Sequence, residues 1–219
     1  AAAEDPPGAR ADYDQAVALR RAAGGSTPSG DLAASLASVL ESRATLARQE
    51  GRHAEAGRDL DEVLALRDRA LDADPLAQSA AWHQLAVLRF EEERFAEALL
   101  ALDQVEASLG ETDGLLESLI RAAAAVSRGI VLRAVGRPVE ALRCLDVGIA
   151  GLAPATEVAP CWPEQLANAL RNRGLTRRTL GRAQEAIVDH DRALAQYDAL
   201  IEAHGSERFH LDRAAPQAD

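Results

Sequence analysis

Arginines recur at a fixed register along this 219-residue chain and could serve as anion-binding groups. One set stands at equivalent places in successive repeated segments, with Phe90 at the remaining place: Arg48, Arg133 and Arg178. A guanidinium presents a planar fork of N–H donors that matches a carboxylate, so this set could hold acidic groups of a ligand. Alternatively, these arginines pair with Glu and Asp of neighbouring helices and only keep the surface soluble. The sequence leaves both interpretations open.

A second set of arginines lies on the packing side of its helices: Arg43, Arg128 and Arg173. A charge that is buried has to be paired, because an unpaired buried charge is very costly. Aspartates recur at one register of the other helices and offer such partners: Asp14, Asp61, Asp103, Asp146 and Asp191. We therefore expect an Arg–Asp ladder between helices, with a structural role.

Residue patterns for catalysis are missing from the sequence. It has no Gly-rich phosphate loop, no nucleophile beside a base and no paired carboxylates in an apolar setting. The five histidines are scattered, and Cys144 and Cys161 have neither a metal-ligand spacing nor the number needed for a disulfide framework. The sequence predicts a protein that is not an enzyme and that has no metal or cofactor.

Composition points to protein partners. The net charge of −11 argues against non-specific binding of nucleic acid, which needs a basic surface. The charge is uneven, at about −10 over residues 1–112 and about −1 over residues 113–219. No apolar run approaches the roughly 18 residues of a membrane span. We expect a cytoplasmic protein that does not bind membranes.

The elements that position these side chains come from an internal repeat. A Gly-Arg-x-x-Glu-Ala segment begins at Gly51, Gly136 and Gly181, and its variant begins at Glu93, so the spacings are 42, 43 and 45 residues. Apolar residues follow i, i+3, i+4, i+7 on both sides of each segment, which is typical of amphipathic helices. One helix pair per period of this length indicates a helical solenoid.

The expected architecture is a single all-α solenoid over residues 1–219. Residues 9–23 match the second helix of a repeat, and we expect the first helix of that repeat to be missing from the chain. Four helix pairs are expected at 31–74, 76–110, 113–152 and 163–204, followed by the start of a further or capping helix at 207–215. The Pro-rich insertion at 153–163 carries Trp162, which either projects as a contact or folds onto the nearest hydrophobic seam.

The repeat resembles the tetratricopeptide repeat (TPR) family. Its pattern W-x2-L-G then A-x3-F is written here as Trp82-x2-Leu85-Ala86 followed by Ala98-x3-Leu102. The period exceeds the 34 residues of the family by about two helical turns, as in an extended-helix bacterial type. The resemblance implies a right-handed superhelix whose first helices line a concave groove for peptides or partner helices. A chaperone-tail clamp of this family needs Lys, which the chain lacks.

The resemblance also places candidate contact residues one step off the buried stripe of each first helix, at i, i+4, i+7 spacing. In the first such helix, Glu41 and Thr45 share the stripe with Arg48. The predicted partner-binding set is Arg48, His83, Val87, Phe90, Val126, Ile130, Arg133, Asn168, Arg171, Asn172, Leu175 and Arg178. Arginine forks over an apolar floor suit an acidic-amphipathic helix or an extended peptide.

Three functions fit these features. The first is a protein–protein interaction scaffold or adaptor that binds a partner peptide or helix in the concave groove. The second is a regulatory or sensor domain of a larger multidomain protein. The third is a self-assembly module, and thus a homo-oligomer, that stacks through its terminal helices.

Overall fold

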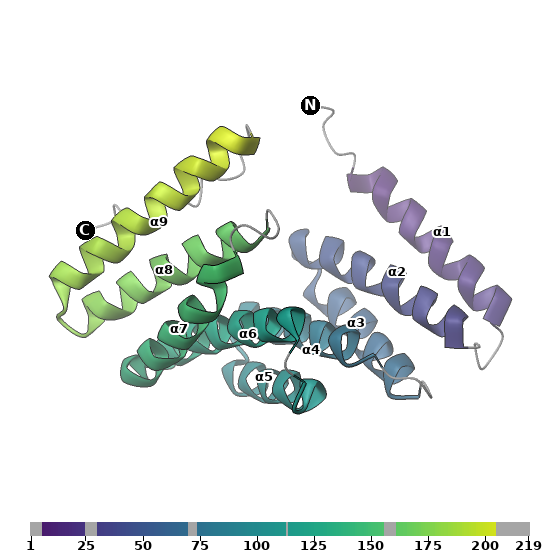
Figure 1. Ribbon diagram of the computed structural model, residues 1–219. Helices are drawn as coiled ribbons and strands as arrows, with labels where there is room; N and C mark the ends of the chain where they lie inside the picture. The colour runs from purple at the N-terminus through teal and green to yellow at the C-terminus, as the bar shows by residue number, and fades with distance from the viewer. Residues whose placement is uncertain (1–5, 25–29, 70–73, 113, 156–160, 205–219) are drawn as a thin grey trace. The chain divides into compact units, whose positions relative to one another are not determined.

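The computed structural model describes residues 6–24, 30–69, 74–112, 114–155 and 161–204 (Figure 1). Over these residues the chain is helical and holds no strand, which confirms the all-α prediction. The helices are α1 (Pro6–Gly24), α2 (Gly30–Gln49), α3 (His53–Asp68), α4 (Pro75–Glu91), α5 (Phe95–Leu109), α6 (Leu115–Ala134), α7 (Pro138–Leu152), α8 (Cys161–Thr179) and α9 (Ala183–His204), with a 3-10 turn at Ala153–Ala155. The helix predicted at 207–215 lies outside the described residues.

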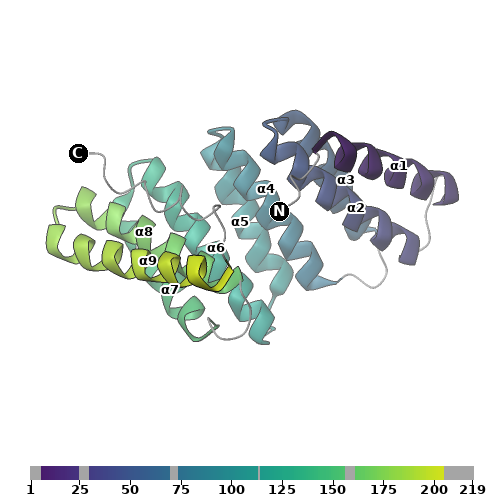
Figure 2. The same ribbon diagram turned by 90° about the horizontal axis from the view of Figure 1, so that it is seen from above.

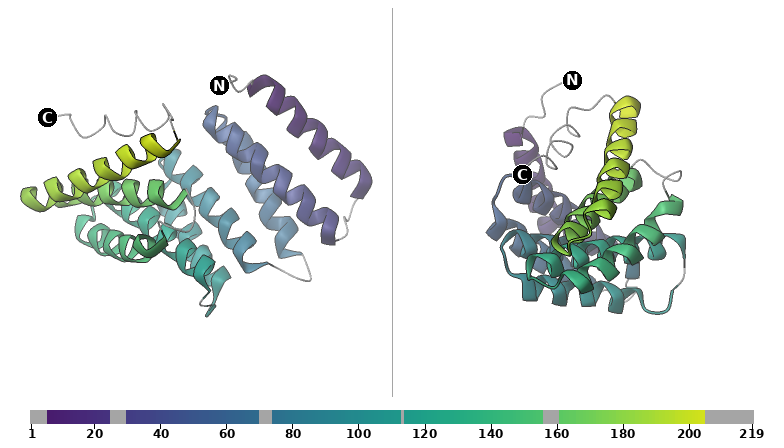
Figure 3. Two further views of the ribbon diagram at one scale, coloured as in Figure 1. Left: turned by 45° about the horizontal axis from the view of Figure 1, so that its top comes forward. Right: turned by 90° about the vertical axis from the view of Figure 1, so that its left-hand side faces the viewer.

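The helices fall into two compact units. Unit 1 is Ala1–Gly110 and holds α1 to α5, whereas unit 2 is Glu111–Asp219 and holds α6 to α9. Within unit 1, α2 packs on α3 and α4 packs on α5, and α1 covers α2 (Figure 2). Within unit 2, α6 packs on α7 and α8 packs on α9, while α7 also contacts α8 (Figure 3). Each unit therefore consists of neighbouring helix pairs, as the repeat predicts.

A tight turn joins the two helices of each pair and explains the repeated Gly-Arg-x-x-Glu segment. Gly51, Gly136 and Gly181 adopt φ values of +74°, +76° and +75°, a left-handed conformation that glycine adopts without steric cost. Glu93 takes the same role at φ 59°. In the first turn the N–H of Gly51 donates to the carbonyl of Arg48, and the N–H of Arg52 donates to that of Ala47. These bonds satisfy the last carbonyls of the first helix, as in a Schellman motif.

The arginine of each turn directly precedes the second helix, and its side chain binds the glutamate three residues later. Arg137 donates from Nε and Nη2 to the two carboxylate oxygens of Glu140 at 2.7 and 2.6 Å. Arg182 holds Glu185 in the same way, at 2.6 Å for both bonds. Arg52 with Glu55 and Arg94 with Glu97 complete the set. The repeated motif is thus a structural element of the turn.

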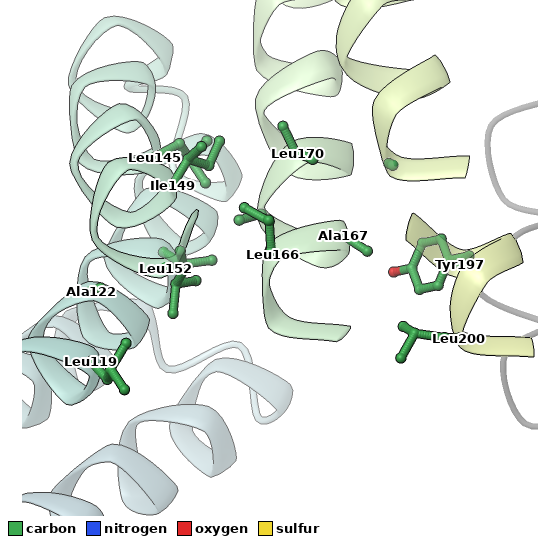
Figure 4. Packing of buried hydrophobic residues seen from close by; sticks show 13 residues of the cluster. Leu119, Ala122, Leu145, Ile149, Leu152, Leu166, Ala167, Leu170, Tyr197 and Leu200 are labelled. Carbon is green, nitrogen blue, oxygen red and sulfur yellow. The ribbon is translucent and has the colours of Figure 1, made fainter. Parts of the chain in front are cut away.

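Unit 2 packs around an aliphatic core with one buried aromatic ring, that of Tyr197 (Figure 4). Small residues let the helices of each pair approach closely. A Cβ on Gly129 would lie 2.6 Å from Cγ of Leu145, and one on Gly174 would lie 2.8 Å from Cε1 of His190. His190 thus takes the place in its pair that Leu145 takes in the preceding pair. Trp162 packs against this core, so of its two expected placements the fold-back onto the hydrophobic seam is the one observed.

Unit 1 has a separate core of the same kind. It is built from Val17 of α1 and from aliphatic residues of α2, α3 and α4, including Leu40, Leu60 and Leu88. Trp82 packs against it from α4. Each unit consequently carries one of the two tryptophans of the chain at the edge of its own core.

Candidate partner-binding site

Two of the three packing-side arginines, Arg43 and Arg173, pair with aspartates, as the ladder hypothesis requires. Arg43 donates from Nη1 to Asp14 at 2.9 Å, and Arg173 donates from Nη1 to Asp146 at 2.8 Å. Each of these bonds joins a first helix to the second helix of the preceding pair. The ladder is therefore present in both units, and these arginines stabilise the packing between repeats.

The buried partner of each arginine is an aspartate that the sequence analysis missed. Arg43 forms a two-bond fork with Asp59, at 2.8 and 2.7 Å, and these bonds raise its pKa. Arg173 forms the same fork with Asp189, at 2.9 and 2.7 Å, and the Asp189 carboxylate is fully buried. The sequence analysis placed Asp61 and Asp191 at the ladder register, but the forks are formed by the residues two positions earlier.

A signal for these partners exists in the sequence. Asp59 and Asp189 each stand 16 residues after their arginine, and the same spacing joins Leu85 to Ala101 in the second repeat. In that repeat apolar residues replace both charged members of the pair. In the third repeat the spacing joins Arg128 to Cys144, and burial raises the pKa of that thiol. Cys144 is therefore a protonated packing residue and a weak nucleophile.

In unit 1 the stripe of candidate contact residues is largely occupied by bonds within the chain. Arg48 donates to Glu91 of the next first helix at 2.5 Å. Glu41 accepts two bonds from Arg67, at 2.9 and 2.8 Å. On α4 the Phe90 ring packs against Phe95, with ring centroids 5.8 Å apart. The Arg48–Glu91 pair is the internal pairing that the sequence analysis left open as the alternative to ligand binding.

In unit 2 the equivalent stripe carries Arg133 and Arg171, which have no such carboxylate partner among the described residues. Arg133 of α6 donates from Nη2 to Oδ1 of Asn172 at 3.4 Å. Arg171 of α8 donates from Nη2 to Oδ1 of Asn168 at 3.2 Å. The structure brings these four predicted contact residues together on the side where α6 meets α8, and we call them the α6–α8 cluster.

Two half-buried apolar side chains, Ile130 and Leu175, lie on the same two helices as the cluster. Arg178, at the end of α8, is exposed. Val126 is only 2% exposed, because its methyl group packs against the helix backbone at Gly148 of α7. A ligand on this face cannot reach Val126, so the structure corrects its predicted place in the apolar floor. His83 and Val87 of α4 are half-buried, and burial lowers the pKa of His83.

Neither a metal centre nor a membrane span emerges from the part of the chain that the structure describes. The described His, Cys, Asp and Glu side chains form no group of three or more that could hold a metal ion. No described helix combines the length and apolar character needed to cross a membrane.

These features define a class, that of helical-repeat proteins built from packed helix pairs. No protein-family model matches the sequence, and no curated protein matches it either. Solved structures do match over most of the chain, and the fold they share with it is that of tetratricopeptide repeats.

Three of these structures show the extent of the likeness. BtubC (BKLC) from P. vanneervenii has a TM-score of 0.69 at 15% identity, covering 97% of this chain and 89% of its own. The kinesin-light-chain-type protein of Podosopora anserina, with nearly identical TPR-like repeats, has a TM-score of 0.64 at 21% identity, covering 92% and 89%. YrrB, a TPR protein with an unusual peptide-binding site, has a TM-score of 0.51 at 17% identity, covering 92% and 83%. At these identities the likeness concerns the fold.

Proposed function

We propose that the protein is an interaction scaffold that binds an acidic peptide or helix of a partner protein on its first helices, chiefly in unit 2. The observation that carries this proposal is the α6–α8 cluster. It holds two arginines beside apolar Ile130 and Leu175, and the described part of the chain supplies no carboxylate to them. A face that combines apolar surface with uncompensated positive charge suits an acidic-amphipathic partner.

The equivalent stripe in unit 1 differs from that of unit 2, and this difference supports the proposal. Arg48 already has its carboxylate from Glu91, so it has little to offer a ligand. Catalysis has no support on this face, because an amide–guanidinium cluster offers neither a nucleophile nor a general base near neutral pH. Binding is the chemistry that remains.

The test is affinity capture from a lysate of the source organism with three baits made from the full chain. The first bait is the native protein. The second carries Arg133→Glu, Arg171→Glu and Arg178→Glu. The matched control carries the same three charge reversals at exposed positions of second helices: Arg58→Glu, Arg143→Glu and Arg192→Glu. Circular dichroism establishes that all three baits remain equally helical.

We expect a protein that is captured by the native and control baits and is lost from the first-helix variant. Equal capture by all three baits would place the binding surface elsewhere on the chain. If no bait captures a partner, light scattering of the native protein over a range of concentrations tests the self-assembly alternative. A mass that rises with concentration and is insensitive to the first-helix substitutions would replace the scaffold proposal.

A further inference from the structure

The last residue of each first helix occupies one equivalent position of the repeat. These residues are Gln49, Glu91, Ala134 and Thr179, at the ends of α2, α4, α6 and α8. In unit 1 the position carries an acid, and Glu91 accepts a hydrogen bond from Arg48 at 2.5 Å. Arg48 is the last residue but one of α2, so this pair joins two successive first helices. The fold thus accommodates an anion at the end of a first helix.

Unit 2 keeps the arginine of this pair and lacks its acid. Arg133 is the last residue but one of α6 and stands at the register of Arg48. Its Nη2 donates to Oδ1 of Asn172 at 3.4 Å, and Nδ2 of Asn172 in turn donates to Oδ1 of Asn168 at 2.8 Å. Burial and the nearby charge of Arg171 both lower the pKa of Arg133. Its Nε is buried without an acceptor among the described residues, so the guanidinium is held only by a neutral amide.

Thr179 places a hydroxyl where unit 1 has Glu91. The residue is exposed, and its hydroxyl donates to the carbonyl of Leu175 at 3.1 Å within the last turn of α8. Arg177 and Arg178 directly precede it, and Arg178 is exposed. Protein kinases select their substrates in part by such charge patterns beside the acceptor residue. Thr179 thus combines an accessible hydroxyl with a basic flank.

We infer that Thr179 is a phosphorylation site whose phosphate pairs with Arg133, as Glu91 pairs with Arg48. In this modification Oγ1 of Thr179 attacks the γ-phosphorus of ATP in the active site of a protein kinase. The Oγ1–P bond forms, the bond from that phosphorus to the β–γ bridging oxygen breaks, ADP leaves, and the hydroxyl proton passes to the catalytic base of the kinase. The product carries a charge of about −1.5 to −2 and three acceptor oxygens, which suit a guanidinium.

A phosphate at the end of α8 meets one opposing effect, which is the negative end of the helix dipole. Glu91 ends α4 in the same way, and its bond to Arg48 shows that an arginine of the preceding first helix can hold such an anion. Phosphorylation would therefore give unit 2 a reversible form of a link that unit 1 has permanently. It would also neutralise Arg133 and weaken partner binding on the same stripe. This last effect, unlike the site itself, rests on the proposed function.

The first experiment tests the modification. The purified full chain is incubated with a lysate of the source organism and with ATP labelled at the γ-phosphate, and mass spectrometry locates the phosphate. The variants are Thr179→Val and, as a matched control, Thr112→Val at another exposed threonine. We expect phosphate on Thr179 of the native and control chains, and a loss of label from Thr179→Val. A native chain that carries no phosphate on Thr179 would overturn the inference.

The second experiment tests the pairing with Arg133. Urea unfolding of the full chain is followed by the fluorescence of Trp162 in a Trp82→Phe background. Thr179→Glu stands in for the phosphate, and Thr179→Gln has the same size without the charge. We expect a higher urea midpoint of unit 2 for Thr179→Glu than for Thr179→Gln, and no such difference once Arg133→Gln is added.

The chain phosphorylated in the lysate should show the same shift, with phosphatase-treated chain as its control. A difference that persists without Arg133 would contradict the pairing, and so would the absence of any difference in both the mimic and the phosphorylated chain. If Arg133→Gln prevents folding, high salt takes its place, because it screens charge pairs and should remove the gain.

Affinity capture separates this inference from the proposed function. An unmodified Thr179, with a partner that is captured by the native bait and lost from the triple first-helix variant, would leave the scaffold proposal intact and exclude the modification site. Phosphorylation of Thr179 with equal capture by all three baits would have the opposite meaning. Loss of the partner from a Thr179→Glu bait, with retention by Thr179→Gln, supports both.

Discussion

At the scale of single residues, Arg43 and Asp59 show how a buried charge is tolerated between α2 and α3. The fork between them is mostly shielded from solvent, with side-chain exposures of 20% and 9%. Replacing Arg43 with Leu leaves the Asp59 carboxylate buried without its cation. We expect the free energy of unfolding of unit 1 to fall by about 2–4 kcal/mol, because breaking a buried pair leaves an uncompensated charge. Urea unfolding measures this loss.

The second repeat supplies the control for that prediction. Leu85 and Ala101 stand at the register of Arg43 and Asp59, and both are buried. The double variant Arg43→Leu with Asp59→Ala copies this apolar pair, so we expect it to regain most of the stability lost by Arg43→Leu. A double variant as unstable as the single one would show that the cost comes from lost packing rather than from the stranded charge.

His190 gives unit 2 a dependence on pH. Burial lowers its pKa below the ordinary value, and the nearby charge of Arg178 lowers it further. The neutral ring packs on Gly174 with Nδ1 buried and without a hydrogen-bond partner among the described residues. Asp189, Asp191 and Arg171 are the other charged groups that act on it.

The sign of the effect follows from the depressed pKa. The unfolded state binds the proton more readily, so the stability of unit 2 is greatest above the unfolded pKa of about 6.5 and is lost as pH falls toward the folded pKa. Leu stands at the equivalent place in the other three pairs, at positions 60, 102 and 145. We expect His190→Leu to flatten the pH dependence of unit 2 as pH falls below about 6.5, and to stabilise unit 2 most at the acidic end of that range.

Fluorescence of Trp162, measured in a Trp82→Phe background, reports this transition within unit 2. This choice matters because burial also lowers the pKa of His83, which lies in unit 1. An unchanged pH profile in the His190→Leu variant would assign the dependence of unit 2 to other groups.

At the scale of helices, we expect the substitution of Gly by Ala to have opposite effects on stability at two positions. A Cβ on Gly57 of α3 would meet Arg89 and Leu88 at 3.6 Å, which is ordinary contact. A Cβ on Gly148 of α7 would lie 2.9 Å from the carbonyl oxygen of Ala122 in α6, so the two helices would have to separate. We expect Gly57→Ala to stabilise the protein by about 0.5–1 kcal/mol and Gly148→Ala to destabilise it by about 1–3 kcal/mol. Thermal unfolding of the two variants provides the measurement.

The helix pairs also show which features of the structure can be predicted from the sequence. The repeated turn and the 3.6-residue periodicity predict the all-α helical-repeat fold, because both are local properties of the chain. The exact boundary between the buried and the accessible stripe of a helix depends on how closely a neighbouring helix packs, and this is not a local property of the chain. Val126 was expected on the accessible stripe, yet Gly148 lets α7 approach closely enough to bury it.

The same limit applies to charge pairs. The five aspartates at the ladder register include the observed partners Asp14 and Asp146. Asp59 and Asp189 share a 16-residue spacing from their arginines, but only the rotation of the two helices of a pair shows that this spacing brings them into contact. The predicted contact residues of unit 2 nevertheless include all four members of the α6–α8 cluster. Their asparagine bridge was not anticipated, because it depends on rotamers that fixed spacing does not determine.

At the scale of the whole chain, each unit has its own hydrophobic core and its own tryptophan. In a repeat protein the stability is approximately the sum of repeat stabilities and nearest-neighbour interfaces, so a substitution acts first on the unit that contains it. Trp82→Phe leaves Trp162 as the reporter of unit 2, and Trp162→Phe leaves Trp82 as the reporter of unit 1. We expect Arg43→Leu to shift the urea midpoint of Trp82 and Gly148→Ala to shift that of Trp162, each with little effect on the other reporter. If either substitution moved both midpoints equally, the two units would unfold as one cooperative body, and the losses argued above for each unit would have to be assigned to the whole chain.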